Sequence, residues 1–374
     1  MSFKFLAAWF SILLAIPSVS SAQKDAPESV RTNTGATHQQ YALDWDAEER
    51  QYLQALDVAT KASNDQRLVY SLCMGLASRY EARHRYTDAE KHYEGAYNAA
   101  RTVFGNESEE VAKALNHLGE MRLDQGQIPQ ADRSFHEALK ILESNKDANR
   151  IAIAAVLNNV AAVQHMTGNL SRAAAVMRKA IRIFEIDPSA TAEDIGTALS
   201  NLATLLQEME RLPEAMTMAQ RAVSILERCN SDHFAVSLVT LARLHLDEGD
   251  SARAEATLQR ALRSIEKLSK EDSPTQALIF GHLGVLYGRT GRHRDAESYF
   301  QRAIEINRRL LGLEHPRLLD SMDAYANLLR ATKRKGEAKK LEMHVREQRE
   351  KYRRQNPAAA SVVDVSSIMR QRDQ

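Results

Sequence analysis

The sequence predicts an all-α solenoid of helix-turn-helix repeats, on the strength of two observations. One-sided apolar stripes occur in pairs through most of the 374 residues, as in residues 277–316, where Gly291 separates the two stripes. Small residues also recur within these pairs at a nearly constant spacing. Because stacked repeats form one elongated body, the length of the chain does not imply several globular domains.

The repeat can be counted on the small residue that opens each second helix. Successive positions are 42 residues apart, with one step of 39: Ala89, Ala131, Ala173, Ala215, Ala254, Ala296 and Ala338. The first helices keep the same register at Ala77, Gly119, Ala161, Ala203, Ala242, Gly284 and Ala326. We therefore predict seven helix pairs, at about residues 68–104, 110–146, 151–187, 193–230, 233–270, 275–312 and 317–353. The short step is expected to fall in the connector, because residues 227–231 have the character of a helix end.

These units resemble tetratricopeptide repeats, and the 42-residue form is similar to the kinesin light chain subclass. The resemblance rests on leucine–small pairs such as Leu118-Gly119 and Leu283-Gly284 and on the connector Gly312–Pro316. It also rests on the turn glycines Gly126, Gly168, Gly249 and Gly291, which His84, Glu210 and Lys333 replace in three units. It covers about residues 68–353 and implies a right-handed superhelical solenoid of about seven repeats.

The N-terminal residues 1–22 predict a secretory signal peptide. Lys4 precedes an apolar run from Phe5 to Ile16, and small residues at 20–22 suit a signal peptidase. The run is shorter than the ~20 apolar residues that a membrane span needs. Export to a periplasm or to the exterior is therefore expected, in preference to an uncleaved anchor or a buried N-terminal helix.

The remaining segments flank the repeats. We expect a disordered linker at residues 23–40, a capping helix or partial repeat at 41–64, the solenoid at 65–354 and a disordered tail at 355–374. The last helix is rich in both cations and carboxylates from Arg330 to Arg354. Such mixed charge favours a solvated C-terminal cap over an anion- or membrane-binding surface.

No motif in the sequence carries recognisable chemistry. It has no GxGxxG after a strand, no GxxxxGK[ST], no GxSxG, no HExxH and no CxxC, and its 12 histidines are scattered among the units. Cys73 has the position of a core thiol, and Cys229 lies about four repeats away, beyond the ~7 Å Cα separation that a disulfide allows. We therefore predict no enzymatic activity, no cofactor and no metal site.

The family resemblance implies a concave groove lined by residues beside the leucine–small pairs. The predicted peptide-binding residues are Asn116, Asn158, Asn159, His165, Asn201, Thr204, Arg243, His282, Arg289 and Asn327. Asparagine is a poor helix former, so Asn158, Asn159 and Asn201 in mid-helix need a reason. Either their amides bind a partner backbone, for which they offer a donor and an acceptor, or they bond to the neighbouring unit.

The expected function is a non-enzymatic interaction scaffold outside the cytoplasm that binds a protein or peptide segment. A net charge of +1 gives no global field for nucleic acid, and no membrane span is expected after signal cleavage. One alternative is an enzyme that processes cell-wall polymers or carbohydrates with a two-carboxylate site inside the superhelix. Another is an envelope assembly factor whose basic C-terminal helix makes a weak contact with anionic lipid.

Overall fold

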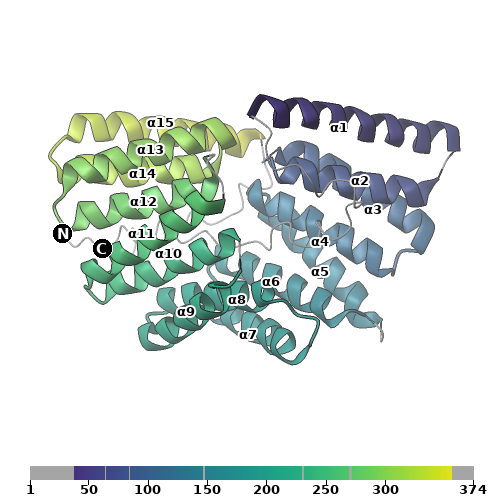
Figure 1. Ribbon diagram of the computed structural model, residues 1–374, viewed down its shortest axis with the longest axis horizontal. Helices are drawn as coiled ribbons and strands as arrows, with labels where there is room; N and C mark the ends of the chain where they lie inside the picture. The colour runs from purple at the N-terminus through teal and green to yellow at the C-terminus, as the bar shows by residue number, and fades with distance from the viewer. Residues whose placement is uncertain are drawn as a thin grey trace. The chain divides into compact units, whose positions relative to one another are not determined.

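The computed structural model describes residues 38–63, 65–83, 85–145, 148–229, 231–268 and 272–355, and within these ranges it contains helices and no strand (Figure 1). The predicted signal peptide and almost all of the predicted linker and tail lie outside the described residues. The chain divides after Val156 into two compact units, each of which is described by itself.

The first unit begins with α1 (His38–Val58), which continues in a π-helical turn (Ala59–Ser63). Helix pairs follow: α2 (Gln66–Glu81) with α3 (Tyr86–Phe104), and α4 (Glu109–Asp124) with α5 (Ile128–Ser144). The division between the units falls within α6 (Arg150–Met166), which pairs with α7 (Leu170–Ile186). The remaining pairs are α8 (Ala192–Glu208) with α9 (Leu212–Leu226), α10 (Asp232–Asp247) with α11 (Ser251–Leu268), α12 (Pro274–Arg289) with α13 (His293–Leu311), and α14 (Pro316–Ala331) with α15 (Lys335–Gln355).

The small residues of the repeat form the contact between the two helices of each pair. All seven alanines that open the second helices are 0% exposed. The first-helix alanines of the same register, such as Ala161 and Ala203, are at most 1% exposed. A side chain of one carbon lets the two backbones approach closely, and larger apolar residues fill the space on either side. The predicted helix-turn-helix architecture is thus confirmed.

The turn inside each pair requires a left-handed residue. In the pair of α6 and α7, the Gly168 N–H bonds to the His165 carbonyl at 2.9 Å, and the Asn169 N–H reaches back to the Gln164 carbonyl at 2.8 Å. The four turn glycines have φ between 69° and 82°, and Glu210 and Lys333 occupy the same position at φ 60° and 65°. His84, the third predicted replacement, lies outside the described residues.

Glu210→Gly is expected to stabilise the protein. A left-handed residue with a Cβ costs ~1–2 kcal/mol, whereas glycine loses only about 0.5–1 kcal/mol of chain entropy on folding. The free energy of unfolding should therefore rise by roughly 0.5–1 kcal/mol in chemical denaturation. Glu266→Gly, at an exposed position inside α11, is the control and should cost about 1 kcal/mol. A loss of stability in both variants would contradict the turn geometry.

The short step of the repeat does not come from the connector, so the prediction that placed it there is wrong. The connector after α9 covers residues 227–231 and is as long as the connector after α7, at 187–191. Instead the helix before the connector is short: α9 has 15 residues, whereas the other second helices have 17 to 21. α10 has 16 residues, as many as the first helices α2, α4, α12 and α14. The short step therefore comes mainly from α9.

The helix α1 contacts the first complete pair through polar groups. Glu49 accepts a hydrogen bond from the Tyr80 hydroxyl at 2.6 Å and pairs with Arg85 Nη1 at 3.2 Å. The same contact recurs further along, where Glu255 of α11 accepts from Tyr287 at 2.7 Å and from Arg292 at 3.0 Å. α1 therefore makes the contacts of a second helix that precedes the first pair.

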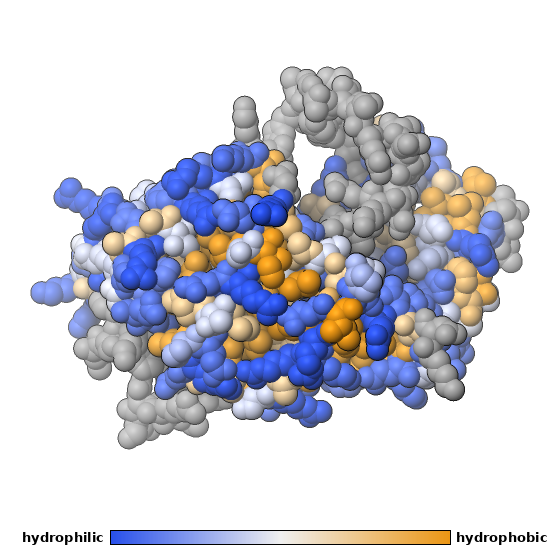
Figure 2. Space-filling view, turned by 60° about the horizontal axis from the view of Figure 1, so that its bottom comes forward, coloured by the Kyte–Doolittle hydropathy of each residue, from blue (hydrophilic) through white to orange (hydrophobic). Residues whose placement is uncertain are grey.

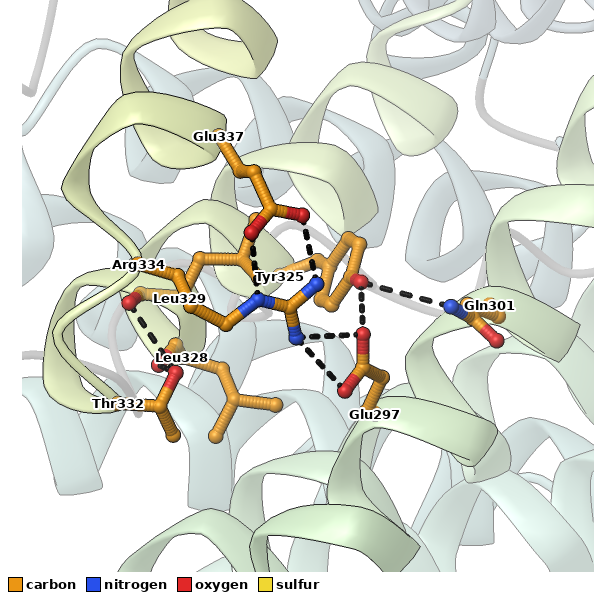
Figure 3. A network of polar contacts seen from close by, with 8 residues as sticks. All are labelled: Glu297, Gln301, Tyr325, Leu328, Leu329, Thr332, Arg334 and Glu337. Carbon is orange, nitrogen blue, oxygen red and sulfur yellow. Dashed lines mark hydrogen bonds and ion pairs between the residues drawn. The ribbon is translucent and has the colours of Figure 1, made fainter.

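The C-terminal helix α15 is fastened by ion pairs (Figure 3). Arg334 lies between two carboxylates, with Nη1 2.8 Å from both oxygens of Glu297 and Nη2 2.7 Å from Glu337. The Tyr325 hydroxyl also donates to Glu297, and this bond and Arg334 together lower the pKa of that carboxyl. Further along α15, Arg349 pairs with carboxylates of α14. Many cations of this basic segment are therefore engaged within the fold, as expected of a terminal cap.

Candidate functional site

The structure places most of the predicted binding residues along successive first helices of the second unit. We call these the first-helix row: Asn158, Asn159 and His165 in α6, Asn201 and Thr204 in α8, Arg243 in α10, and His282 and Arg289 in α12. All but Arg289 are at most 7% exposed. The repeat brings side chains that are about one repeat apart in sequence to equivalent places on neighbouring helices. The row is therefore a consequence of the register.

The three asparagines bond to one another. Asn201 Nδ2 donates to Asn158 Oδ1 at 3.1 Å, across the interface between α8 and α6. Asn158 Nδ2 in turn donates to Asn159 Oδ1 at 3.3 Å. Of the two explanations for these mid-helix amides, the structure thus shows the hydrogen bond to the neighbouring repeat. Whether a peptide also contacts them stays a prediction.

A second set of bonds joins the C-terminal ends of the first helices. His165 Nε2 lies 2.8 Å from Glu208 Oε2, and Gln207 Nε2 donates to Asp247 Oδ2 at 2.5 Å. Arg289 closes the series, with Nη1 3.8 Å from Asp247 Oδ1 and Nη2 donating to the Leu246 carbonyl at 3.0 Å. Consecutive first helices from α6 to α12 are therefore linked by polar contacts, each of which involves an ionisable group.

Glu208 and Asp247 are not among the predicted binding residues, although the sequence holds a signal for them. They are separated by the same step in sequence as Ala215 and Ala254, and so occupy equivalent places in successive repeats. Two carboxylates at equivalent places predict a shared role. What the sequence does not show is which donors reach them, because those donors come from other repeats.

The centre of the row holds a buried cation beside a buried imidazole. Burial lowers the pKa of Arg243, although Glu208 and Asp247 oppose this, and the guanidinium stays charged. Burial, together with the charge of Arg243, holds the pKa of His282 well below its usual range. His282 is therefore neutral at physiological pH. The row thus holds three amides, one hydroxyl, two imidazoles and two guanidiniums, beside the carboxylates of Glu208 and Asp247, and its side chains are buried apart from that of Arg289.

The other two predicted binding residues lie on further first helices. In the first unit, Asn116 donates to Glu120 Oε1 at 2.9 Å, and His117 Nδ1 lies 3.0 Å from Glu120 Oε2. Asn327 is half-buried in α14. All ten predicted residues therefore lie on first helices, eight of them between α6 and α12.

Neither a metal centre nor a membrane span is found in the described ranges. No group of three or more His, Cys, Asp or Glu side chains there is placed to hold a metal ion. None of the helices within these ranges is both long and apolar enough to cross a membrane. Cys73 is buried and Cys229 half-buried, both as free thiols, and burial raises the pKa of Cys73 to about 11. The thiol of Cys73 is therefore protonated, as a core cysteine should be.

Two family models match the chain. The model of the MalT-like TPR region matches residues 105–269, and a tetratricopeptide repeat model matches residues 275–351. The chain contains tetratricopeptide repeats. No curated protein was found to match its sequence.

Solved structures share the fold of these tetratricopeptide repeats. Aspartyl phosphate phosphatase F from Bacillus subtilis is 14% identical with a TM-score of 0.60, over 93% of each chain. The quorum sensor NprR from B. thuringiensis is 12% identical with a TM-score of 0.60, over 82% of this chain and 84% of that one. A kinesin light chain-like repeat protein from Podosopora anserina is 20% identical with a TM-score of 0.41, over 55% of this chain and 99% of that one. At such identities the first two similarities show the fold and nothing further.

Proposed function

We propose that this tetratricopeptide repeat protein is a non-enzymatic scaffold that holds a protein or peptide segment against the first-helix row. The observation that carries the proposal is the continuous series of hydrogen-bonding side chains over α6, α8, α10 and α12. Catalysis would need groups positioned around a reacting atom, and no catalytic motif is present in the sequence. A row that repeats along the chain suits an elongated partner better than a small substrate.

We further propose that the protein acts outside the cytoplasm, in a periplasm or beyond the cell. The predicted signal peptide of residues 1–22 supports this location. A contact of α15 with anionic membranes stays a prediction. The ion pairs of Arg334 and Arg349 favour the role of a cap for this helix.

The test is capture of partners from a periplasmic or extracellular extract by the chain from Gln23 to Gln374. We expect a partner that the wild type retains and that an Asn158/Asn159/Asn201→Ala variant retains at least about tenfold less, since three peptide contacts together are worth more than about 1.4 kcal/mol. The matched control is Gln220/Gln259/Gln301→Ala, which removes three amides from the second helices α9, α11 and α13. It should retain the partner as the wild type does.

Because the three asparagines bond to one another, the variant must first be shown to be folded. Equal helicity by circular dichroism and an unchanged digestion pattern meet that requirement. If a folded variant keeps every partner of the wild type, the partner does not lie on the first-helix row. If the Gln220/Gln259/Gln301→Ala control loses the partner as well, the contact is not specific to the first-helix row.

A further inference from the structure

The second helices of four consecutive repeats carry an exposed basic stripe. Along each helix the stripe follows a spacing of four, three and four residues, which keeps it on one face. We call it the outer stripe: Ala175, Lys179, Arg182 and Ile186 in α7; Thr217, Arg221, Ser224 and, just after the helix, Arg228 for α9; Ala256, Arg260, Arg263 and Lys267 in α11; and Ser298, Arg302, Glu305 and Arg309 in α13. Apart from Arg260, which is half-buried, all of these residues are exposed. Nine of the sixteen are cations and one is an anion.

The stripe has an internal order. Its first position is small in all four repeats, and its second is a cation in all four, at Lys179, Arg221, Arg260 and Arg302. In the other repeats the first position holds Lys91, Arg133 or Lys340, and the second holds Gly95, Glu137 or His344. A row of small side chains beside a row of long cations is thus confined to α7, α9, α11 and α13. Figure 2 brings forward the side on which α7 and α9 lie in Figure 1, where hydrophilic residues cover much of the surface.

Ion pairs join the successive second helices α7, α9, α11 and α13. Arg221 Nη2 of α9 lies 2.6 Å from Glu185 Oε1 of α7, and Arg260 of α11 pairs with Glu227, just after α9. Arg292, at the start of α13, lies 3.0 Å from Glu255 of α11. Each second helix of the four is therefore within side-chain reach of the next.

Two of the aligned cations are also fixed by aromatic rings. The guanidinium carbon of Arg302 lies 4.0 Å from the ring centroid of Phe280, and that of Arg260 lies 5.1 Å from the ring of Phe234. Stacking on a ring restricts the guanidinium plane and leaves its N–H edge able to bond to a carboxylate, as Arg260 does with Glu227. Such side chains lose little freedom when they bind an anion.

The first helices of the same repeats have the opposite balance of charge. α6, α8, α10 and α12 hold five carboxylates, at Glu193, Asp194, Glu208, Asp232 and Asp247, against three arginines, Arg150, Arg243 and Arg289. Although the net charge of the whole chain is only +1, the helices α7, α9, α11 and α13 present a local positive field. Screening limits this field to about 8–10 Å, so it acts on a partner that touches the stripe.

We propose that the outer stripe binds an extended acidic segment of a partner protein, with a carboxylate at about every third residue. Packed helices lie on the order of 10 Å apart, and a chain extended in the polyproline II conformation advances about 3.1 Å per residue with three residues per turn, so that every third side chain lies on one face. Carboxylates three residues apart therefore meet the cations of successive repeats, while the row of small side chains leaves room for the backbone. This surface is separate from the first-helix row and adds a second contact to the scaffold.

The test uses the full chain and a labelled 12-residue peptide with glutamate at every third position and glycine or serine between. The stripe variant is R182S/R263S, because both arginines are exposed and no ion pair is found for either within the described ranges. The matched control is R172S/R294S, which removes two exposed arginines from α7 and α13 outside the stripe. Fluorescence anisotropy at low salt should show binding that weakens at least about fivefold in the stripe variant and less than about twofold in the control.

A second peptide, with its four glutamates adjacent, tests the spacing and should bind at least about threefold more weakly to the wild type. The proposal is overturned if the wild type does not bind the spaced peptide, if both peptides bind equally, or if both variants weaken binding equally. It is also overturned if vesicles of anionic phospholipid, and not the spaced peptide, bind in a way that R182S/R263S abolishes. The stripe would then be a membrane surface.

Discussion

Gly284→Leu is expected to lower the free energy of unfolding by about 1–3 kcal/mol. Gly284 lies in α12 against α13, and a Cβ at this position would lie 2.8–2.9 Å from three ring carbons of Phe300. Real Cβ atoms essentially never come this close to another atom, and Phe300 is only 1% exposed, so its ring has no free space to enter. Thermal and urea unfolding measure the loss. An unchanged midpoint would mean that the helices of this repeat do not pack as described.

The helix α12 provides its own control. Gly288 lies one turn further along, and a Cβ there would meet Leu328 Cδ1 at 3.5 Å, an ordinary contact. Gly288→Ala should therefore gain about 1 kcal/mol from helix propensity. Gly284→Ala should lose stability although the same propensity acts on it. Replacing Phe300 by leucine in the Gly284→Ala variant should recover part of that loss, because the smaller side chain makes room for the new methyl group.

Arg349→Ala is expected to release the C-terminal helix at a cost of about 2–3 kcal/mol. Nη2 of Arg349 lies 3.0 Å from Asp320 Oδ1 and 2.7 Å from Asp323 Oδ2, and these carboxylates are only 16% and 13% exposed. Removing the cation leaves two buried carboxyl groups together without a counter-charge, and keeping both ionised costs about 3–5 kcal/mol at a fully buried site and less here because Arg349 is 30% exposed. Hydrogen exchange of α15 and urea unfolding are the measurements. Arg346→Ala, which removes an 82% exposed partner of Glu350, should change stability by less than about 0.5 kcal/mol.

The effect of Arg349→Ala should depend on pH. Burial raises the pKa of Asp320 from 3.8 to about 7 even with Arg349 beside it. The folded state binds a proton on Asp320 more tightly than the unfolded state does, so protonation of Asp320 stabilises the fold. This contribution to the free energy of unfolding is complete below about pH 4 and is lost as the pH rises through about 7. Without Arg349 the cost of ionising Asp320 grows, so the variant should lose more at pH 8 than at pH 5. Equal losses of stability at both pH values would contradict the raised pKa of Asp320.

The fold could be predicted from the sequence because its main contact is made by the smallest side chains. Alanine and glycine at a fixed spacing mark the positions where helices touch, and these positions do not depend on side-chain conformation. The pairing of Gly284 with Phe300, and of Gly119 with Phe135, follows the same logic. Repeats in which the first helix has alanine, such as that of Ala161, carry Met177 or another residue in place of the phenylalanine.

The candidate site could be predicted only in part. The register correctly put Asn159 and Asn201 at equivalent places, but the hydrogen bonds of Asn158 to both of them depend on side-chain conformation. The contacts of Glu208 and Asp247 were missed for the same reason, because their partners come from neighbouring repeats. The position of the short step was predicted wrongly because the shortening falls in α9, which ends at Leu226, while the connector after it is as long as the connector after α7.

The measurement that tests the scaffold most directly is hydrogen exchange of the protein with and without its captured partner. The proposed function predicts slower exchange in α8, α10 and α12 around Asn201, Arg243 and His282, at partner concentrations well above the dissociation constant. Protection confined to the second helices α7, α9, α11 and α13, or to α15, would contradict binding on the first-helix row.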